Sequence, residues 1–122
     1  MLNSMSVAIR RKIQVLRDTS VRLSSLASQR TPIPDSTHLD QVKRYDEWLN
    51  KTASELSSYA NKFEREMSSI SPNEVASFER AFNLQYLQLQ QKIQHENRQF
   101  TMVSNIMKNK HDTAKNAINN IR

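Results

Sequence analysis

Residues 42–70, VKRYDEWLNKTASELSSYANKFEREMSSI, carry an apolar side chain at every seventh position. The repeat consists of Val42, Leu49, Leu56, Phe63 and Ile70. A spacing of seven places these side chains along one face of an α-helix, and neighbouring apolar residues widen that face. The stretch therefore predicts one long amphipathic helix, from about residue 38 to about residue 69, that packs on another helix at a shallow angle.

The segment before this helix has a weaker repeat of the same period. It predicts a helix over residues 5–29, whose sevenfold series is Leu2, Ile9, Leu16 and Leu23. If this series occupies the a positions of a heptad, Lys12 and Thr19 occupy the d positions. The apolar seam is therefore interrupted. Pro32 and Pro34 follow, and proline ends a helix because it lacks a backbone donor. We therefore expect a basic amphipathic helix within residues 1–30 and a linker over residues 31–36.

The segment after the helix opens with a strong start signal. Ser71, Pro72 and Glu74 have the spacing of a capping box with proline at the first helical position. A third helix is expected from there to about Asn119, with its apolar stripe interrupted near Asn97 and at His111. Residues 37–122 then form an antiparallel helical hairpin. The predicted fold class is all-α: a long, coiled-coil-like hairpin with an additional N-terminal helix.

The composition of the 122 residues excludes several kinds of chemistry. Without glycine there is no glycine-rich phosphate loop, and without cysteine there is no disulfide or thiolate metal site. The three histidines are not spaced to place two metal ligands on one helix face, and a thin hairpin offers no dry cleft for a catalytic carboxylate. We therefore expect no enzyme and no cofactor. No apolar run has the length of a transmembrane segment, and no Sec-type signal is present.

A candidate protein-binding surface lies on the helix predicted over residues 38–69. The aromatic residues on either side of the turn are expected to close the hairpin as its core, although Trp48 also suits an exposed partner anchor. An alternative function is thus a cytoplasmic helical adaptor or secretion chaperone that binds a partner helix. Its partner-binding seam would consist of Val42, Leu49, Leu56, Phe63 and Trp48.

The charge distribution allows a third hypothesis. The net charge is +6, and residues 1–30 alone carry +5. A basic helix of this kind could bind nucleic acid through Arg10, Arg11, Lys12 and Arg17, with an affinity that falls steeply with salt. Residues 1–44 contain no aromatic side chain to stack on bases, and no known nucleic-acid-binding motif is present. A solvated helix face is the simpler interpretation, so we do not expect a nucleic acid partner.

The C-terminal sequence SNIMKNKHDTAKNAINNIR, residues 104–122, resembles the C-terminus of the needle-filament subunits of bacterial type III secretion systems. The match has no gap and rests on Ser104, Asn105, Lys108, Asp112, Ile118, Asn120 and Arg122. Upstream, VASFERAF followed by LQLQ is similar to the related inner-rod subunits. The resemblance covers about residues 70–122. The long segment before it fits a rod subunit better than a needle subunit, whose N-terminal arm is short.

The resemblance implies a structural function. Subunits of this family leave the bacterium through the secretion apparatus without a Sec signal and stack helically through the C-terminal helix. The expected function is therefore a non-enzymatic subunit of a type III secretion apparatus, of the inner-rod or needle class. Its partners would be copies of itself or other helical secretion components. The expected assembly residues are those of the match together with Ile121.

Overall fold

The computed structural model describes residues 2–30 and 38–121, with side chains from residue 7 onward. Within these ranges the chain forms helices and no strand. The elements are α1 (Leu2–Ser28), α2 (Leu39–Ser69), the 3₁₀ turn η2 (Pro72–Glu74), α3 (Val75–Arg98), the 3₁₀ turn η3 (Thr101–Asn105) and α4 (Lys108–Asn119). The prediction of an all-α fold is confirmed.

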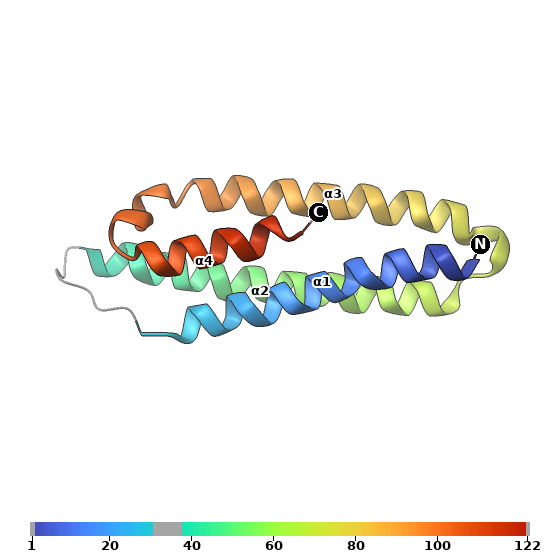
Figure 1. Cartoon of the computed structure of the whole chain (residues 1–122), viewed down its shortest axis with the longest axis horizontal. Helices are drawn as coiled ribbons and strands as arrows, with labels where there is room; N and C mark the ends of the chain where they lie inside the picture. The colour runs from blue at the N-terminus through green and yellow to red at the C-terminus, as the bar shows by residue number, and fades with distance from the viewer. Residues whose placement is uncertain (1, 31–37, 122) are drawn as a thin grey trace.

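The helices lie side by side in one elongated bundle, each antiparallel to the next along the chain (Figure 1). The last helix, α4, has 12 residues against 31 in α2, and α4 ends about midway along the bundle. One half of the bundle thus contains all of these helices, whereas the other half contains α1, α2 and α3. The N-terminal end of α1 lies beside the turn between α2 and α3.

The closest pair of helices is α1 and α2, which contact each other along most of their length. Small side chains make this approach possible, because Ala53 and Ala60 of α2 and Thr19 of α1 are all buried. The Ser20 hydroxyl donates a hydrogen bond of 2.6 Å to the Ala53 carbonyl, which ties the two backbones together. Helix α1 therefore belongs to the core of this chain, and its sevenfold residues Ile9, Leu16 and Leu23 are buried in it.

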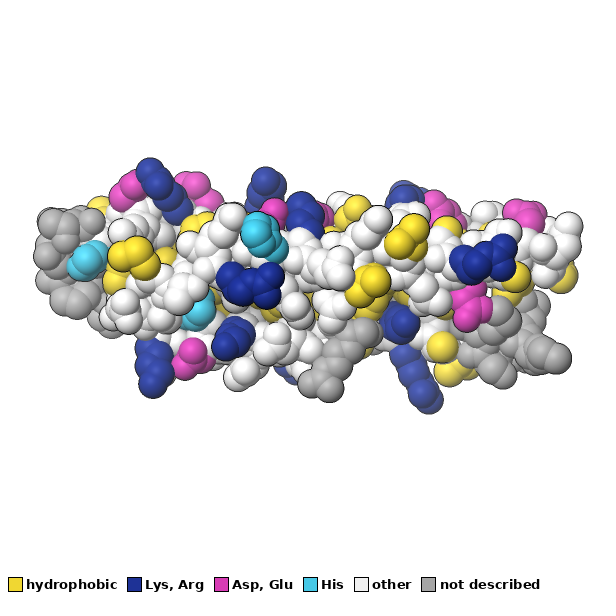
Figure 2. All heavy atoms as spheres, turned by 90° about the horizontal axis from the view of Figure 1, so that it is seen from above, with side chains coloured by type: hydrophobic (Ala, Val, Ile, Leu, Met, Phe, Trp, Pro, Cys, Tyr) yellow, Lys and Arg dark blue, Asp and Glu magenta, His cyan; other side chains and the backbone are white. Residues whose placement is uncertain are grey.

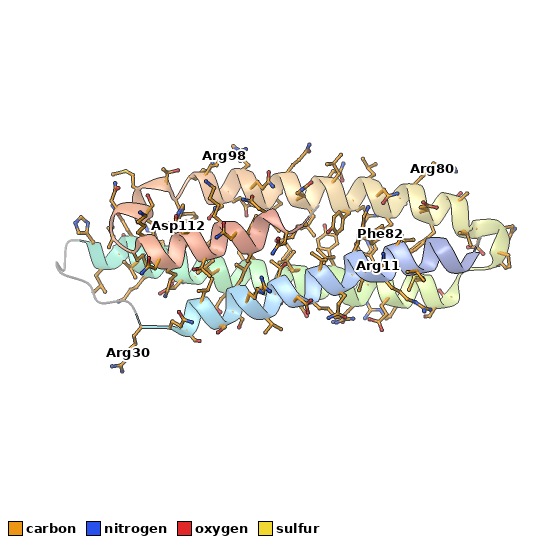
Figure 3. All side chains as sticks on the ribbon, viewed as in Figure 1. Arg11, Arg30, Arg80, Phe82, Arg98 and Asp112 are labelled. Atoms are coloured by element: carbon orange, nitrogen blue, oxygen red, sulfur yellow. The ribbon has the colours of Figure 1, made fainter. Side chains whose placement is uncertain are left out.

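Large aromatic side chains fill the space between α2 and α3. The Phe63 and Phe82 rings meet edge to face with their centroids 4.7 Å apart, and Phe82 stacks on Tyr86 at 5.7 Å. Ring pairs in these geometries stabilise a core beyond the area that they bury. Figure 3 shows Phe82 on the inner side of α3, with Arg80 and Arg98 projecting from its outer side. The bulk of the rings explains why α3 lies farther from α2 than α1 does.

The turn between α2 and α3 is short and capped. Ser71 and Glu74 form a capping box around η2, with Pro72 at the first position of the turn. The Ser71 carbonyl accepts a hydrogen bond of 2.9 Å from the Glu74 amide. Proline fits here because its missing amide hydrogen would have no partner at a helix start. The turn therefore reverses the chain without glycine.

The prediction of one helix from Pro72 to about Asn119 is wrong, because α3 ends at Arg98 and α4 begins at Lys108. The Thr101 hydroxyl bonds the Arg98 carbonyl, and the Ser104 hydroxyl bonds the Thr101 carbonyl at 2.6 Å. Such bonds compete with the helical ladder. The break also places Val103 and Met107 in the core. The reversal buries apolar side chains that a straight helix would have carried beyond the bundle.

Some expectations fall on residues outside the described ranges. These are the linker with Pro32 and Pro34, and Arg122 in the C-terminal match. Leu2 and Met5 lie in α1, but their side chains are among those not described. The α2 helix is described from His38, whose side chain makes no capping hydrogen bond.

Candidate functional site

The C-terminal segment is held by a small apolar contact. Ile118 and Ile121 are 1% and 0% exposed, and Ala114 and Ala117 are buried beside them. These residues face α1 and α3, the two helices that flank α4. The Gln90 side-chain amide of α3 also donates a hydrogen bond to the Ile121 carbonyl. The apolar side of α4 is therefore occupied within the chain.

The opposite side of α4 is polar and faces solvent. Lys108, Asp112 and Asn120 are exposed, as is Asn105 in η3, and Ser104 is half-buried. Lys108 and Asp112 are four residues apart and therefore share one helix face, whereas Asn120 directly follows the last residue of α4. We call Asn105, Lys108, Asp112 and Asn120 the α4 polar row. The resemblance to secretion subunits thus rests mainly on surface residues, and Ile118 is its buried member.

A partly buried ion pair fixes the first turn of α4. Lys110 is 7% exposed, and its Nζ donates hydrogen bonds to Asp46 Oδ1 at 3.1 Å and to the Gln29 carbonyl at 2.7 Å. These partners come from α2 and from the end of α1, so a single ammonium group joins three parts of the chain. A buried ammonium requires such partners, because removing it from water is costly.

Aromatic rings surround this end of the bundle. Tyr45 of α2 contacts Trp48, Phe100 and His111, with centroid distances of 5.7, 5.2 and 5.6 Å. Its hydroxyl donates a hydrogen bond of 3.0 Å to Oδ1 of the buried Asn97. Burial, with a smaller contribution from Asp46, raises the pKa of Tyr45 well above its ordinary value. The phenol therefore stays protonated and acts as a hydrogen-bond donor inside the core.

Trp48 lies at the edge of this cluster. The ring is buried, and its Nε1 donates a hydrogen bond of 3.0 Å to Glu96 Oε1 on α3. Glu96 also lies near Lys92, whose Nζ bonds Glu55 at 2.7 Å. The hydrogen bond with Glu55, more than its charge, raises the pKa of Lys92. Trp48 thus joins α2 to α3 in the free chain and is not an exposed anchor.

The seam assigned to a partner helix is occupied by the chain itself. Val42, Leu49, Leu56 and Phe63 all lie in the hydrophobic core. An adaptor that used this seam would have to open the bundle before it could bind. The structure therefore leaves no free groove along these residues.

The basic residues of α1 are partly neutralised. Arg17 hydrogen-bonds Asn61 at 2.9 Å and forms an ion pair with Glu64 of α2. The Lys12 ammonium bonds Asn83 at 3.2 Å and lies 5.3 Å from the centroid of the Tyr86 ring. Figure 2 shows basic and acidic side chains interspersed along the bundle, with hydrophobic side chains in small separate spots. This pattern is typical of a solvated surface more than of a continuous phosphate-binding stripe.

Two absences hold for residues 2–30 and 38–121, the part of the chain that the structure describes. No three His, Asp or Glu side chains in that part of the chain gather closely enough to hold a metal ion. None of the described helices combines the length and the hydropathy that a membrane span requires. Comparison with known proteins found no matching family model, no similar curated protein and no similar solved structure.

Sequence reasoning missed the polar residues that build this end of the bundle. Asn97, Lys110 and His111 are buried, although each is of a type that usually lies at the surface or has a polar partner. The available signal was the interruption of the apolar stripe near Asn97 and at His111. Those interruptions mark polar residues that face the core, and the 3₁₀ turn η3 lies between them.

Removal of Asp46 should destabilise the bundle more than removal of Lys110. Asp46→Ala leaves a buried ammonium with only the Gln29 carbonyl, and we expect a loss of about 3 kcal/mol in the free energy of unfolding. Lys110→Met keeps the length of the side chain and leaves a carboxylate that is 27% exposed, so we expect a loss of about 1 kcal/mol. Urea unfolding followed by circular dichroism measures both. Equal losses would show that the pair is not formed in solution.

Proposed function

We propose that this chain is a non-enzymatic structural subunit of a bacterial type III secretion apparatus, of the inner-rod or needle class, that polymerises through its C-terminal helix. The observation that carries the proposal is the exposure of the α4 polar row, which contains most of the residues behind the resemblance. An exposed row is available to a neighbouring subunit while the bundle stays folded. Stacking of identical subunits requires two complementary surfaces of this kind.

The small apolar contact of α4 also supports the proposal. Buried α4 side chains are Lys110, His111, Ala114, Ala117 and Ile118, whereas α2 buries nine residues, including several large ones. Because hydrophobic stabilisation follows buried apolar area, α4 is the helix with the least apolar contact to lose on detaching. A detached α4 could pack its isoleucines on a neighbour in place of its own chain, as in domain swapping. The closed bundle would then be the free form of the subunit.

The route out of the cell follows from the same proposal. A subunit of this class would be exported through the apparatus itself, without a Sec signal. Its partners would be further copies and other helical components of the apparatus. The adaptor or chaperone hypothesis predicts instead a small oligomer of fixed mass, and the nucleic acid hypothesis predicts salt-sensitive binding.

Reversing the charges of the α4 polar row should prevent assembly without unfolding the chain. The test variant is Lys108→Glu with Asp112→Lys, which keeps the net charge. The matched control is Arg65→Glu with Glu66→Lys, two exposed residues on α2. Light scattering over a concentration series should show wild type and control growing into large species while the test variant stays monomeric. Circular dichroism should show the same melting temperature for all three proteins.

Two outcomes would contradict the proposal. One is a wild-type protein whose mass stays small and fixed at every concentration, which would favour the adaptor hypothesis. The other is a test variant that assembles as readily as wild type. Substitutions are preferred to truncation of residues 102–122, because truncation would remove core residues such as Val103, Ala114 and Ile118. A truncated chain would therefore confuse assembly with folding.

A further inference from the structure

His111 is a titratable group placed where its charged form has no support. The residue is 7% exposed, and neither ring nitrogen has a hydrogen-bond partner among the described residues. A neutral imidazole can remain there at the cost of its lost water contacts. An imidazolium would need a counter-charge or acceptors for both N–H groups.

We propose that His111 is an acid-sensitive latch, whose protonation releases α4 from the bundle while α1, α2 and α3 stay packed. Release lets the charged ring enter water. It breaks the small apolar contact of α4, the Lys110 bonds to Asp46 and the Gln29 carbonyl, and the Gln90 bond to the Ile121 carbonyl. The ring lies in the first turn of α4, so the helix that carries the charge is the helix that leaves. This inference concerns a single chain and does not depend on the proposed secretion function.

The groups of α2 near His111 offer no free counter-charge to a positive ring. From α2, Tyr45 offers a protonated phenol in ring contact at 5.6 Å, and Asp46 is engaged by Lys110 at 3.1 Å. Glu96 of α3 accepts a hydrogen bond from the Trp48 indole and lies near Lys92. Asp46 and Glu96 are therefore already engaged by other groups.

The groups from α1 and from α4 itself add further positive charge. Arg30, Lys108 and Lys110 line one hollow where the end of α1 meets the start of α4. The first turn of a helix also carries a partial positive charge, which disfavours a cation there. On α4, Asp112 favours the protonated ring and Lys115 opposes it. The electrostatic surroundings as a whole favour the neutral imidazole.

The direction of the pH effect follows from these contacts. Burial, more than the opposing Asp112 charge, lowers the pKa of His111 in the folded chain. A group whose pKa is lower when folded binds its proton more readily once released. The contribution of neutral His111 to the stability of the folded chain is thus fully present when the pH is above the ordinary histidine pKa of about 6.5. It is lost as the pH falls from that value through the pKa of the folded state.

Thermal unfolding at two pH values tests the latch. The proteins are wild type, His111→Phe, which keeps a ring against Tyr45 but cannot titrate, and the control His95→Gln at an exposed histidine. Between about pH 7.5 and about pH 5, the melting temperatures of wild type and control should fall by the same amount. That of His111→Phe should fall clearly less. Equal falls in all three would overturn the proposal.

Hydrogen exchange and an imidazole titration separate the latch from general acid unfolding. At about pH 5, after correction for intrinsic rates, amides of residues 111–119 should lose protection while those of α2 keep it. NMR titration of the wild-type protein should place the pKa of the His111 imidazole below the ordinary histidine value of about 6.5. An ordinary pKa for His111 in the folded protein, or equal loss of protection in α2 and α4, would overturn the proposal. The titration decides the question even if His111→Phe does not fold.

Discussion

Ile118→Asp should lower the free energy of unfolding by about 4 kcal/mol, or undock α4 altogether. Ile118 is completely enclosed between α4 and its neighbours, so an aspartate there must either bury a carboxylate or move the helix into water. Small domains have about 5–15 kcal/mol of stability in total, so a loss of this size is a large share. Urea unfolding followed by circular dichroism should show an earlier midpoint.

The matched control is Asn116→Asp, which adds the same charge to an exposed position of the same helix. It should change the stability by less than about 0.5 kcal/mol. Its charge lies near the same C-terminal end, so any helix-dipole effect is shared by both variants. If Ile118→Asp unfolds at the same urea concentration as the control, α4 is not docked on the bundle in solution.

Phe82→Ala should cost about 3–5 kcal/mol, because it empties the centre of the half of the bundle that α4 does not reach. Phe82 contacts the rings of Phe63, Phe78 and Tyr86, and it is 1% exposed. This half of the bundle contains α1, α2 and α3. No fourth helix can move into the cavity there, so the lost contacts are poorly replaced. Urea unfolding gives the change in free energy, provided that the slope of the transition matches that of wild type.

Leu84→Ala is the control for this substitution. Leu84 lies two residues away on α3 and is 57% exposed, and alanine has at least as high a helix propensity as leucine. The change should stay within about 0.5 kcal/mol. A loss of similar size in both variants would mean that the outer side of α3 is buried in solution, for example against another copy of the chain.

The sequence predicted the helices wherever an apolar repeat was long and regular. The sevenfold residues Val42, Leu49, Leu56 and Phe63 of α2 are buried, and so are Ile9, Leu16 and Leu23 of α1. Ile70, just after α2, is partly buried. Both patterns depend on local periodicity, which a single sequence displays directly. The turn at Ser71 and Pro72 was also visible, because capping requires particular residue types at fixed spacings.

The path of the chain after residue 98 could not be predicted in this way. No glycine or proline marks the break, and the reversal depends on whether Phe100, Val103 and Met107 gain more by packing on α1 and α2 than by continuing α3. That balance is a tertiary effect. The Lys110 pair has the same origin, since Asp46 lies 64 residues away in sequence and only the fold brings the two together. Periodicity indicates which face of a helix is apolar, but it does not say which neighbour covers it.

The hydrogen bond between Lys110 and the Gln29 carbonyl joins two residues that are 81 apart in sequence. The contacts of α1 with α2 and of α2 with α3 join helices that are consecutive along the chain. Contacts between consecutive helices close short loops and form early, because the entropy of loop closure rises with chain length. The docking of α4 on α1 is therefore expected to be a late step in folding. Substitutions at that contact should change the unfolding rate and leave the folding rate nearly unchanged. A chain emerging from a ribosome or a narrow channel would first form its three long helices and add the last one afterwards.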